Sequence, residues 1–232
     1  MNNAAREAIL GSIRSHLAAS APHDAREFEI EQVRKGGLAP PLEERGQAPL
    51  PDLFNVFKQN LQAVGGHCLI AQGDADIARA LTQIISSLQK TNLRAQRIAI
   101  SDTPSVERLM HQTDLEIEAL SIAPNASDIF SYDVGISTAQ AAIAETGTLV
   151  LDSADERHRF VSLVPPVHIA IVDASRICET LGQALAFMRK DKELSRTVTF
   201  VTGPSRTADI ELTLAIGVHG PQELYVIVNG ST

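Results

Sequence analysis

The stretch Val167-His168-Ile169-Ala170-Ile171-Val172, which follows Pro165-Pro166, decides the fold class. It is apolar at every position except His168. A strand with one solvated face alternates apolar and polar residues, whereas a continuously apolar strand is covered on both faces. We therefore predict a buried strand at the centre of a mostly parallel sheet.

Short apolar runs and helical periodicities alternate on both sides of this strand. Strands are predicted at 68–71, 97–100, 117–122, 134–136, 139–144, 148–151, 198–201 and 224–228, and helices at 53–64, 75–89, 104–111 and 179–189. This alternation is typical of an α/β domain whose sheet carries helices on both faces. The turn Glu145-Thr146-Gly147 between two of these runs predicts a hairpin or tight corner.

The first 52 residues have a different character. Apolar residues recur at helical spacing over 3–18, and a polar stretch with five prolines, four of them between 40 and 51, follows over 19–52. Proline breaks helices and removes backbone donors, so residues 1–52 are predicted to form a terminal helix on a proline-rich arm. The helix either folds back on its own domain or binds a partner. The arm is expected to be the first region that a protease cuts. Residues 53–232 are predicted to form the α/β domain.

Composition excludes several classes of protein. The chain has 232 residues, of which 44% are hydrophobic, and a formal net charge of -8. An acidic chain has no basic excess for a phosphate backbone, so no nucleic-acid partner is expected. No apolar run is long enough to span a membrane. The N-terminus lacks the apolar centre of a secretory signal, which favours a cytoplasmic location.

Cysteine and histidine usage bears on cofactors. Cys68 and Cys178 are far apart and lie among apolar residues, so buried free thiols are predicted. The chain has no CxxC pair and no HxxxH pair, which argues against a cysteine-ligated iron–sulfur cluster and a bound metal ion. It also has no glycine-rich nucleotide loop. No cofactor is therefore expected.

The segment from Thr202 to Glu211 is the first candidate site. Gly203, Ser205, Arg206 and Thr207 follow a predicted strand and resemble the start of a short helix. Free N–H groups in a first helical turn attract anions, and arginine adds a bidentate donor. We therefore predict an anion site at the carboxyl ends of the strands. The alternative is a capped helix whose arginine pairs with an internal carboxylate.

Two further loops carry candidate residues. Glu145 lies at the glycine-containing corner, where it is a candidate base, nucleophile or hydrogen-bond acceptor. The alternative is a turn glutamate that bonds to nearby backbone N–H groups or to Arg206. His219, between two glycines, is predicted to present its imidazole to the same cleft as Arg206. We expect these three side chains to converge on one concave surface. His168 is interpreted as a core histidine, and 157–159 form a local basic patch that is solvated or contacts an anion or partner.

Four of these segments resemble the LUD-domain family. They are 133–150, with the Ala144-Glu145-Thr146-Gly147-Thr148 sequence, 159–169, 203–211 and 217–221, in that order along the chain. The resemblance covers residues 53 to 229. It implies a three-layer α/β/α sandwich, the fold of ribose-5-phosphate isomerase, glucosamine-6-phosphate deaminase and CoA transferases.

The resemblance also implies a role in lactate utilization. The chain would be the cluster-free subunit of three cooperating proteins that oxidise L-lactate to pyruvate, and its two partners would be iron–sulfur proteins. It would then be an accessory subunit without turnover of its own. In CoA transferases a glutamate near a glycine turn is the nucleophile, which makes Glu145 the candidate catalytic residue. The alternative is a stand-alone enzyme or sensor that binds a small anion.

Overall fold

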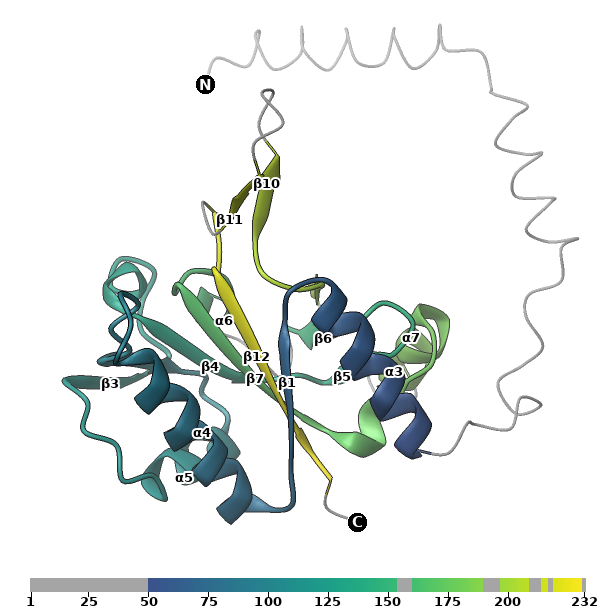
Figure 1. The fold of residues 1–232 in the computed structure, drawn as a ribbon, viewed down its shortest axis with the longest axis horizontal. Coiled ribbons are helices and arrows are strands. Elements are labelled where there is room, and N and C mark those ends of the chain that lie inside the picture. Colours follow the sequence, from purple (N-terminus) through teal and green to yellow (C-terminus); the bar gives the residue numbers. More distant parts are fainter. Residues whose placement is uncertain (1–49, 154–159, 190–196, 209–213, 217–218, 231–232) are drawn as a thin grey trace, which may run out of the picture. The chain divides into compact units, whose positions relative to one another are not determined.

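The computed structural model describes residues 50–153, 160–189, 197–208, 214–216 and 219–230 (Figure 1). Its centre is a six-stranded sheet in the order β1-β12-β7-β4-β2-β3, and all neighbouring strands in it are parallel. These strands are β1 (His67–Ala71), β2 (Arg97–Ile100), β3 (Ala119–Ile122), β4 (Val134–Thr138), β7 (Val167–Asp173) and β12 (Glu223–Asn229). The predicted α/β class with a mostly parallel sheet is confirmed.

Strand β7 occupies the place that its composition predicts. It pairs with β12 on one side and with β4 on the other, and residues 167–172 are all buried. Ile169 and Ile171 contribute to the core on one face of the sheet, whereas Ala170 and Val172 contribute to the core on the other. A strand covered on both faces gains from apolar residues at both alternating sets of positions.

Helices α4 (Asp74–Leu88) and α5 (Pro104–His111) cover the first face. α4 buries Leu81 and Ile85, and α5 buries Val106 and Leu109, in the same apolar cluster as Ile169 and Ile171. Pro104 lies in the first turn of α5, where its missing N–H leaves no helical hydrogen bond unmade.

The second face is covered by helices and by a second sheet. Helix α3 (Leu50–Ala63) packs Phe57 and Leu61 against it, and the short helix α6 (Phe160–Leu163) adds Val161. The second sheet has the order β8-β5-β6-β9, with β5 (Ala141–Ile143), β6 (Thr148–Asp152), β8 (Ile177–Cys178) and β9 (Val198–Val201). β5 and β6 are antiparallel, which confirms the predicted hairpin. Helix α7 (Leu181–Arg189) packs Ala184 against this sheet.

One predicted element is wrong. Residues that were expected to open a helix after Gly203 form β10 (Arg206–Ala208), which pairs antiparallel with β11 (Leu214–Ile216). Ser, Thr and Asp favour helix caps, but the same residues tolerate turns and edge strands. The backbone groups of β10 face β11 in a ladder, so the described segment has no helical first turn to attract an anion.

The remaining short elements are the 3-10 helices η1 (Ile129–Ser131) and η2 (Ala174–Arg176). The predicted helix at 3–18, the arm up to residue 49 and the basic patch at 157–159 lie outside the described residues. Residues 50–52, assigned to the arm, begin α3. The division at residue 52 stays a prediction. In the described part of the chain, no helix combines the length and apolarity needed to cross a membrane.

Candidate functional site

Three predicted site residues line one cavity, which we call the amino-edge cavity. Gly203, Ser205 and His219 line it together with Ser162, His168 and Thr202, and its volume is about 210 Å³. Ser162 precedes β7 and His219 precedes β12, while His168 lies near the start of β7. The cavity therefore lies at the amino ends of these parallel strands.

This position corrects the expectation that the Gly203 loop lies at the carboxyl ends of the parallel strands. The loop follows β9, which belongs to the second sheet and runs antiparallel to β6. The backbone of Ser205 donates to the carbonyl of Pro221 at 2.8 Å, which joins this loop to the segment that leads into β12. A loop that enters a parallel strand lies at its amino end by necessity.

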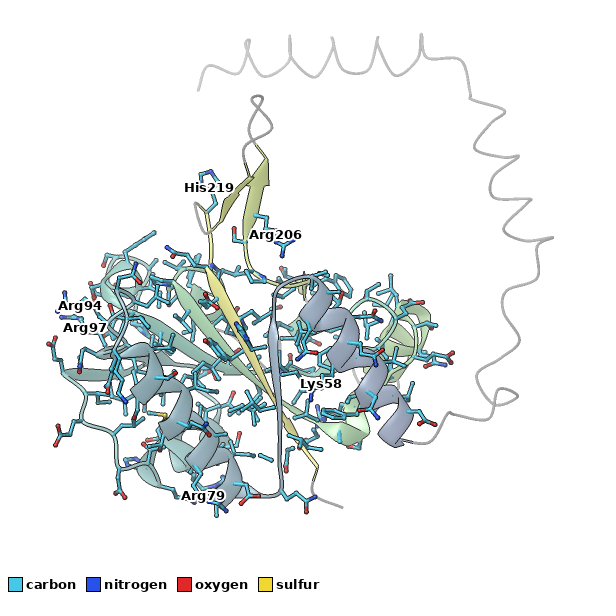
Figure 2. All side chains as sticks on the ribbon, viewed as in Figure 1. Lys58, Arg79, Arg94, Arg97, Arg206 and His219 are labelled. Carbon is cyan, nitrogen blue, oxygen red and sulfur yellow. The ribbon has the colours of Figure 1, made fainter. Side chains whose placement is uncertain are left out.

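Arg206 and His219 are neighbours that point in different directions (Figure 2). The guanidinium of Arg206 donates to the carbonyl of Val64, just beyond the C-terminal end of α3. His219 is exposed beside the amino-edge cavity. Thr207 lies in β10, which pairs with β11. Arg206 is thus tied to α3 and does not line the cavity.

Glu145 is held by the elements around its own turn. Its Oε1 accepts a hydrogen bond from the backbone N–H of Leu181 at 3.1 Å, at the start of α7. The adjacent carbonyl of Ala144 accepts from the side chain of Asn60 at 2.8 Å. The bond comes from a backbone N–H in another element, and Arg206 donates to the carbonyl of Val64. Glu145 does not line the amino-edge cavity.

A chain of hydroxyl groups connects the Glu145 turn to the Gly203 loop. Thr146 Oγ1 lies 2.7 Å from Thr148 Oγ1, which lies 2.7 Å from Thr202 Oγ1. The glycine between these threonines is also constrained. Gly147 has a φ of 64°, and a Cβ there would lie 2.3 Å from the backbone nitrogen of Leu61 in α3. The packing of the turn against α3 therefore explains why a glycine lies between Thr146 and Thr148.

His168 is a buried ionisable residue in the lining of the amino-edge cavity. The His168 side chain is fully buried, and this desolvation lowers its pKa to about 4. Its Nε2 lies 2.9 Å from the Ser137 hydroxyl in β4. Its Nδ1 is buried and has no hydrogen-bond partner among the described residues. The prediction of a core histidine is confirmed for its burial, but one of its two nitrogens is left unpaired.

A larger hollow, which we call the carboxyl-edge cleft, lies at the other end of the same strands. Its volume is about 630 Å³, within the range of small-molecule sites. Asp173 ends β7, Asn229 ends β12 and Thr138 ends β4, and all three line it with Asp74, Gln140 and Arg176. Ligands of open α/β sheets bind at this edge because the loops after neighbouring strands converge there.

Side-chain contacts join several of the residues that line the carboxyl-edge cleft. Gly73 N–H donates to Asn229 Oδ1 at 3.2 Å, and Asn229 Nδ2 donates to Asp173 Oδ1 at 3.1 Å. Arg176 Nε lies 3.6 Å from Asp173 Oδ2, and Arg176 Nη1 donates to the Gln140 carbonyl at 3.4 Å. These contacts join side chains from distant parts of the sequence.

The carboxyl-edge cleft was not among the sites predicted above, although the sequence carries a signal for it. Polar residues follow three of the apolar runs: Asp173 after 167–172, Asn229 after 224–228, and Ser101-Asp102 after 97–100. In a parallel sheet such residues share one edge. Of the predicted site residues, Gly203, Ser205 and His219 lie at the opposite edge.

The two cysteines do not form a disulfide with each other. Cys68 and Cys178 are free and partly buried. Burial raises the pKa of the Cys68 thiol to about 11 and also raises that of Cys178. Among the residues that the structure describes, no three His, Cys, Asp or Glu side chains are grouped as metal ligands would be.

Comparison with known proteins places the chain in a family. The family model of the LUD domain matches residues 54–228. Lactate utilization protein C of Geobacillus thermodenitrificans is 31% identical over 181 residues, which cover 76% of this chain and 68% of that protein. An uncharacterised protein of Neisseria meningitidis is 33% identical over 155 residues, and the chain spans 64% of its length.

A solved structure supports the fold. The crystal structure of a DUF162 family protein from Deinococcus radiodurans has a TM-score of 0.56 and 22% sequence identity. The likeness covers 79% of this chain and all of that one. Because the LUD model matches about three quarters of the sequence and the motifs fall in order, the chain belongs to the LUD-domain family.

Proposed function

We propose that the protein serves in lactate utilization as the cluster-free subunit of a three-protein system that oxidises L-lactate to pyruvate. The observation that carries this proposal is the LUD-domain match together with relatives named lactate utilization protein C. The oxidation removes two electrons and two protons from lactate. In the proposed system, the iron–sulfur clusters of two partner proteins accept the electrons.

The composition of the chain agrees with a subunit of this kind. A cluster held by cysteines commonly needs four thiolates, and the chain has two cysteines, each with a raised pKa. A raised pKa disfavours the thiolate that binds iron. In the proposed system, the subunit assembles with the redox proteins and has no independent turnover.

Deletion of the gene tests this role in the organism that encodes the protein. The deletion strain is expected to grow on glucose as before and to lose growth on L-lactate, and the intact gene should restore growth. A tagged copy purified from lactate-grown cells should retain two proteins that contain iron and acid-labile sulfide. Normal growth of the deletion strain on L-lactate would refute the role, and purification without iron–sulfur proteins would refute the three-protein assembly.

The carboxyl-edge cleft favours a second candidate function, the binding of a small molecule by the protein on its own. Its volume and the contacts that join Asn229, Asp173 and Arg176 support this candidate. Thermal unfolding with lactate, pyruvate, CoA and sugar phosphates tests it. A ligand at one hundred times its dissociation constant stabilises the folded protein by about 2.7 kcal/mol. The stabilisation should disappear in Asp173→Asn and Arg176→Gln. If none of these compounds raises the melting temperature, this candidate is rejected.

A further inference from the structure

We propose that the outer edge of β3 pairs with β3 of a second copy of this chain, antiparallel and about a twofold axis at Ser121. The two six-stranded sheets would then continue into one. β3 is the last strand in the order of the sheet, so one of its edges has no neighbour among the described strands (Figure 1). A free strand edge is a template on which another chain can add a strand. This proposal is independent of the proposed role in lactate utilization.

The backbone hydrogen bonds of β3 show which residues face its free edge. The N–H groups of Ala119 and Ala123 donate to carbonyls of β2 and of the residue before it, at 3.3 and 2.8 Å. Backbone groups alternate in direction along a strand of a parallel pair, so Ser121 faces β2 as well. The N–H and C=O groups of Leu120 and Ile122 therefore point outward, and they have no partner in the described part of the chain.

The side chains at these two outward positions are apolar and exposed. Leu120 is 42% exposed and Ile122 is 45% exposed, and they share one face of the sheet because they are two residues apart. Natural proteins commonly protect a free edge with lysine, proline or a bulge. The strand Ala119–Ile122 has neither lysine nor proline. The free edge thus offers unpaired backbone groups and an apolar surface together.

An antiparallel pair centred on Ser121 matches these groups to each other. Leu120 then lies opposite Ile122 of the second copy, and both residues carry outward N–H and C=O groups. Opposite residues of this kind exchange two hydrogen bonds. The twofold axis repeats the pair, so all the outward groups of both residues are used. The apolar side chains of the two copies meet on one face of the joined sheet.

The neighbouring registers match less well. A pair centred on Leu120 sets Ile122 opposite the charged Glu118 of the second copy. A pair centred on Ile122 sets Leu120 opposite Pro124 of the second copy, and proline has no N–H to donate. The register centred on Ser121 sets Glu118 opposite Pro124, where neither residue needs a donor from the other. The N–H of Glu118 already donates at 2.9 Å to the carbonyl of the residue before β2.

The charges beside β3 favour the antiparallel direction. Asp114, Glu116 and Glu118 precede the strand, whereas residues 119–127 include no charged side chain. Antiparallel pairing sets the acidic end of each strand beside the uncharged end of the other. Parallel pairing would set the acidic ends beside each other, where like charges repel. The edge is thus complementary to itself in charge as well as in hydrogen bonding.

Sedimentation velocity of the full chain over a wide range of concentrations tests the association. We expect a reversible dimer, because a pair of short strands forms a small interface and small interfaces are weak. Leu120→Lys sets a charge opposite Ile122 twice in each dimer, so it should raise the dissociation constant about tenfold or more. The matched control is Ile70→Lys. Ile70 is 55% exposed in β1, at the other end of the sheet, and its substitution should leave the dimer unchanged.

Oxidative cross-linking tests the register. The two copies of Ser121 would form a non-hydrogen-bonded pair, in which Cα atoms are about 4.5 Å apart and a disulfide fits. Ser121→Cys should therefore form a covalent dimer on a non-reducing gel, and the unaltered protein should not. Leu120→Cys is the matched control, because the two copies of residue 120 would lie diagonally, roughly 7–8 Å apart. It should cross-link much less.

Three results would overturn the proposal. They are a monomer at every concentration, a dimer that Leu120→Lys leaves intact or that Ile70→Lys dissociates, and equal cross-linking of Ser121→Cys and Leu120→Cys. If circular dichroism shows that Leu120→Lys does not fold, the cross-linking of Ser121→Cys decides. The proposed lactate role would still stand or fall on the growth of the deletion strain.

Discussion

Replacement of Gly147 by alanine should destabilise the protein strongly, because two independent costs coincide there. The residue has a φ of 64°, and the left-handed region costs an L-residue about 1–2 kcal/mol. The added Cβ would also lie 2.3 Å from Leu61 N and 2.6 Å from Leu61 Cα. These are backbone atoms of α3, which no side-chain rotation can move away, and overpacking of this kind typically costs about 1–3 kcal/mol.

The sum predicts that Gly147→Ala lowers the free energy of unfolding by about 2–5 kcal/mol, a large part of the roughly 5–15 kcal/mol of a typical domain. In a chain of this length each kcal/mol lowers the melting temperature by about 2–4 °C. Urea and thermal unfolding followed by circular dichroism measure both quantities. The variant should also lose the contact between Asn60 and the carbonyl of Ala144, since α3 must move away.

Gly182→Ala is the matched control for this experiment. Gly182 lies in α7, and the nearest atom to a Cβ there is Thr180 Oγ1 at 3.8 Å. Alanine should therefore be neutral or stabilise the helix by up to about 1 kcal/mol. A loss below about 1 kcal/mol in Gly147→Ala would refute the packing of α3 on this turn. A variant that keeps full stability but loses growth on L-lactate would assign the turn a chemical role instead.

Three other perturbations test the remaining contacts. Burial lowers the pKa of His168 from 6.5 to about 4, so the unfolded chain takes up a proton at a higher pH than the folded protein does. The free energy of unfolding should therefore fall by up to about 3 kcal/mol as the pH drops from about 6.5 to 4. His168→Leu should flatten this pH dependence in urea titrations. The Cys68 thiol, with a pKa of about 11, should react with iodoacetamide at pH 8 much more slowly in the folded protein than in urea, and equal rates would contradict its burial. Arg206→Ala removes one exposed hydrogen bond to the Val64 carbonyl and should lower the free energy of unfolding by less than about 1.5 kcal/mol. A larger loss would show that Arg206 stabilises the fold through contacts besides the one at the end of α3.

The core strands could be predicted from the sequence because their signal is local. The apolar run at 167–172 requires cover on both faces, and the structure places β7 between β12 and β4. The hairpin around Gly147 follows from a turn between two short apolar runs. The segment after Gly203 shows the limit of such signals. Its Ser, Thr and Asp residues suit a helix start and an edge hairpin equally, and only pairing with 214–216 decides for β10.

The candidate sites depend on the tertiary structure more than the core strands do. The polar loops around Gly203, Glu145 and His219 stand out in the sequence, but nothing local says at which end of the sheet each lies. Strand order and direction decide that, through pairings between residues far apart in the chain. They join Gly203, Ser205 and His219 to His168 in one cavity and leave Glu145 at α7.

What the sequence by itself determined is the α/β class, the buried central strand, the family and the burial of His168, because each depends on residue types within one segment. What only the tertiary structure decided is which polar residues meet. Thr138, Asp173 and Asn229 line one cleft because three parallel strands end at the same edge, although up to 91 residues separate them in the chain. Packing of the helices and the second sheet sets the strand order, and that order decides which loops share an edge.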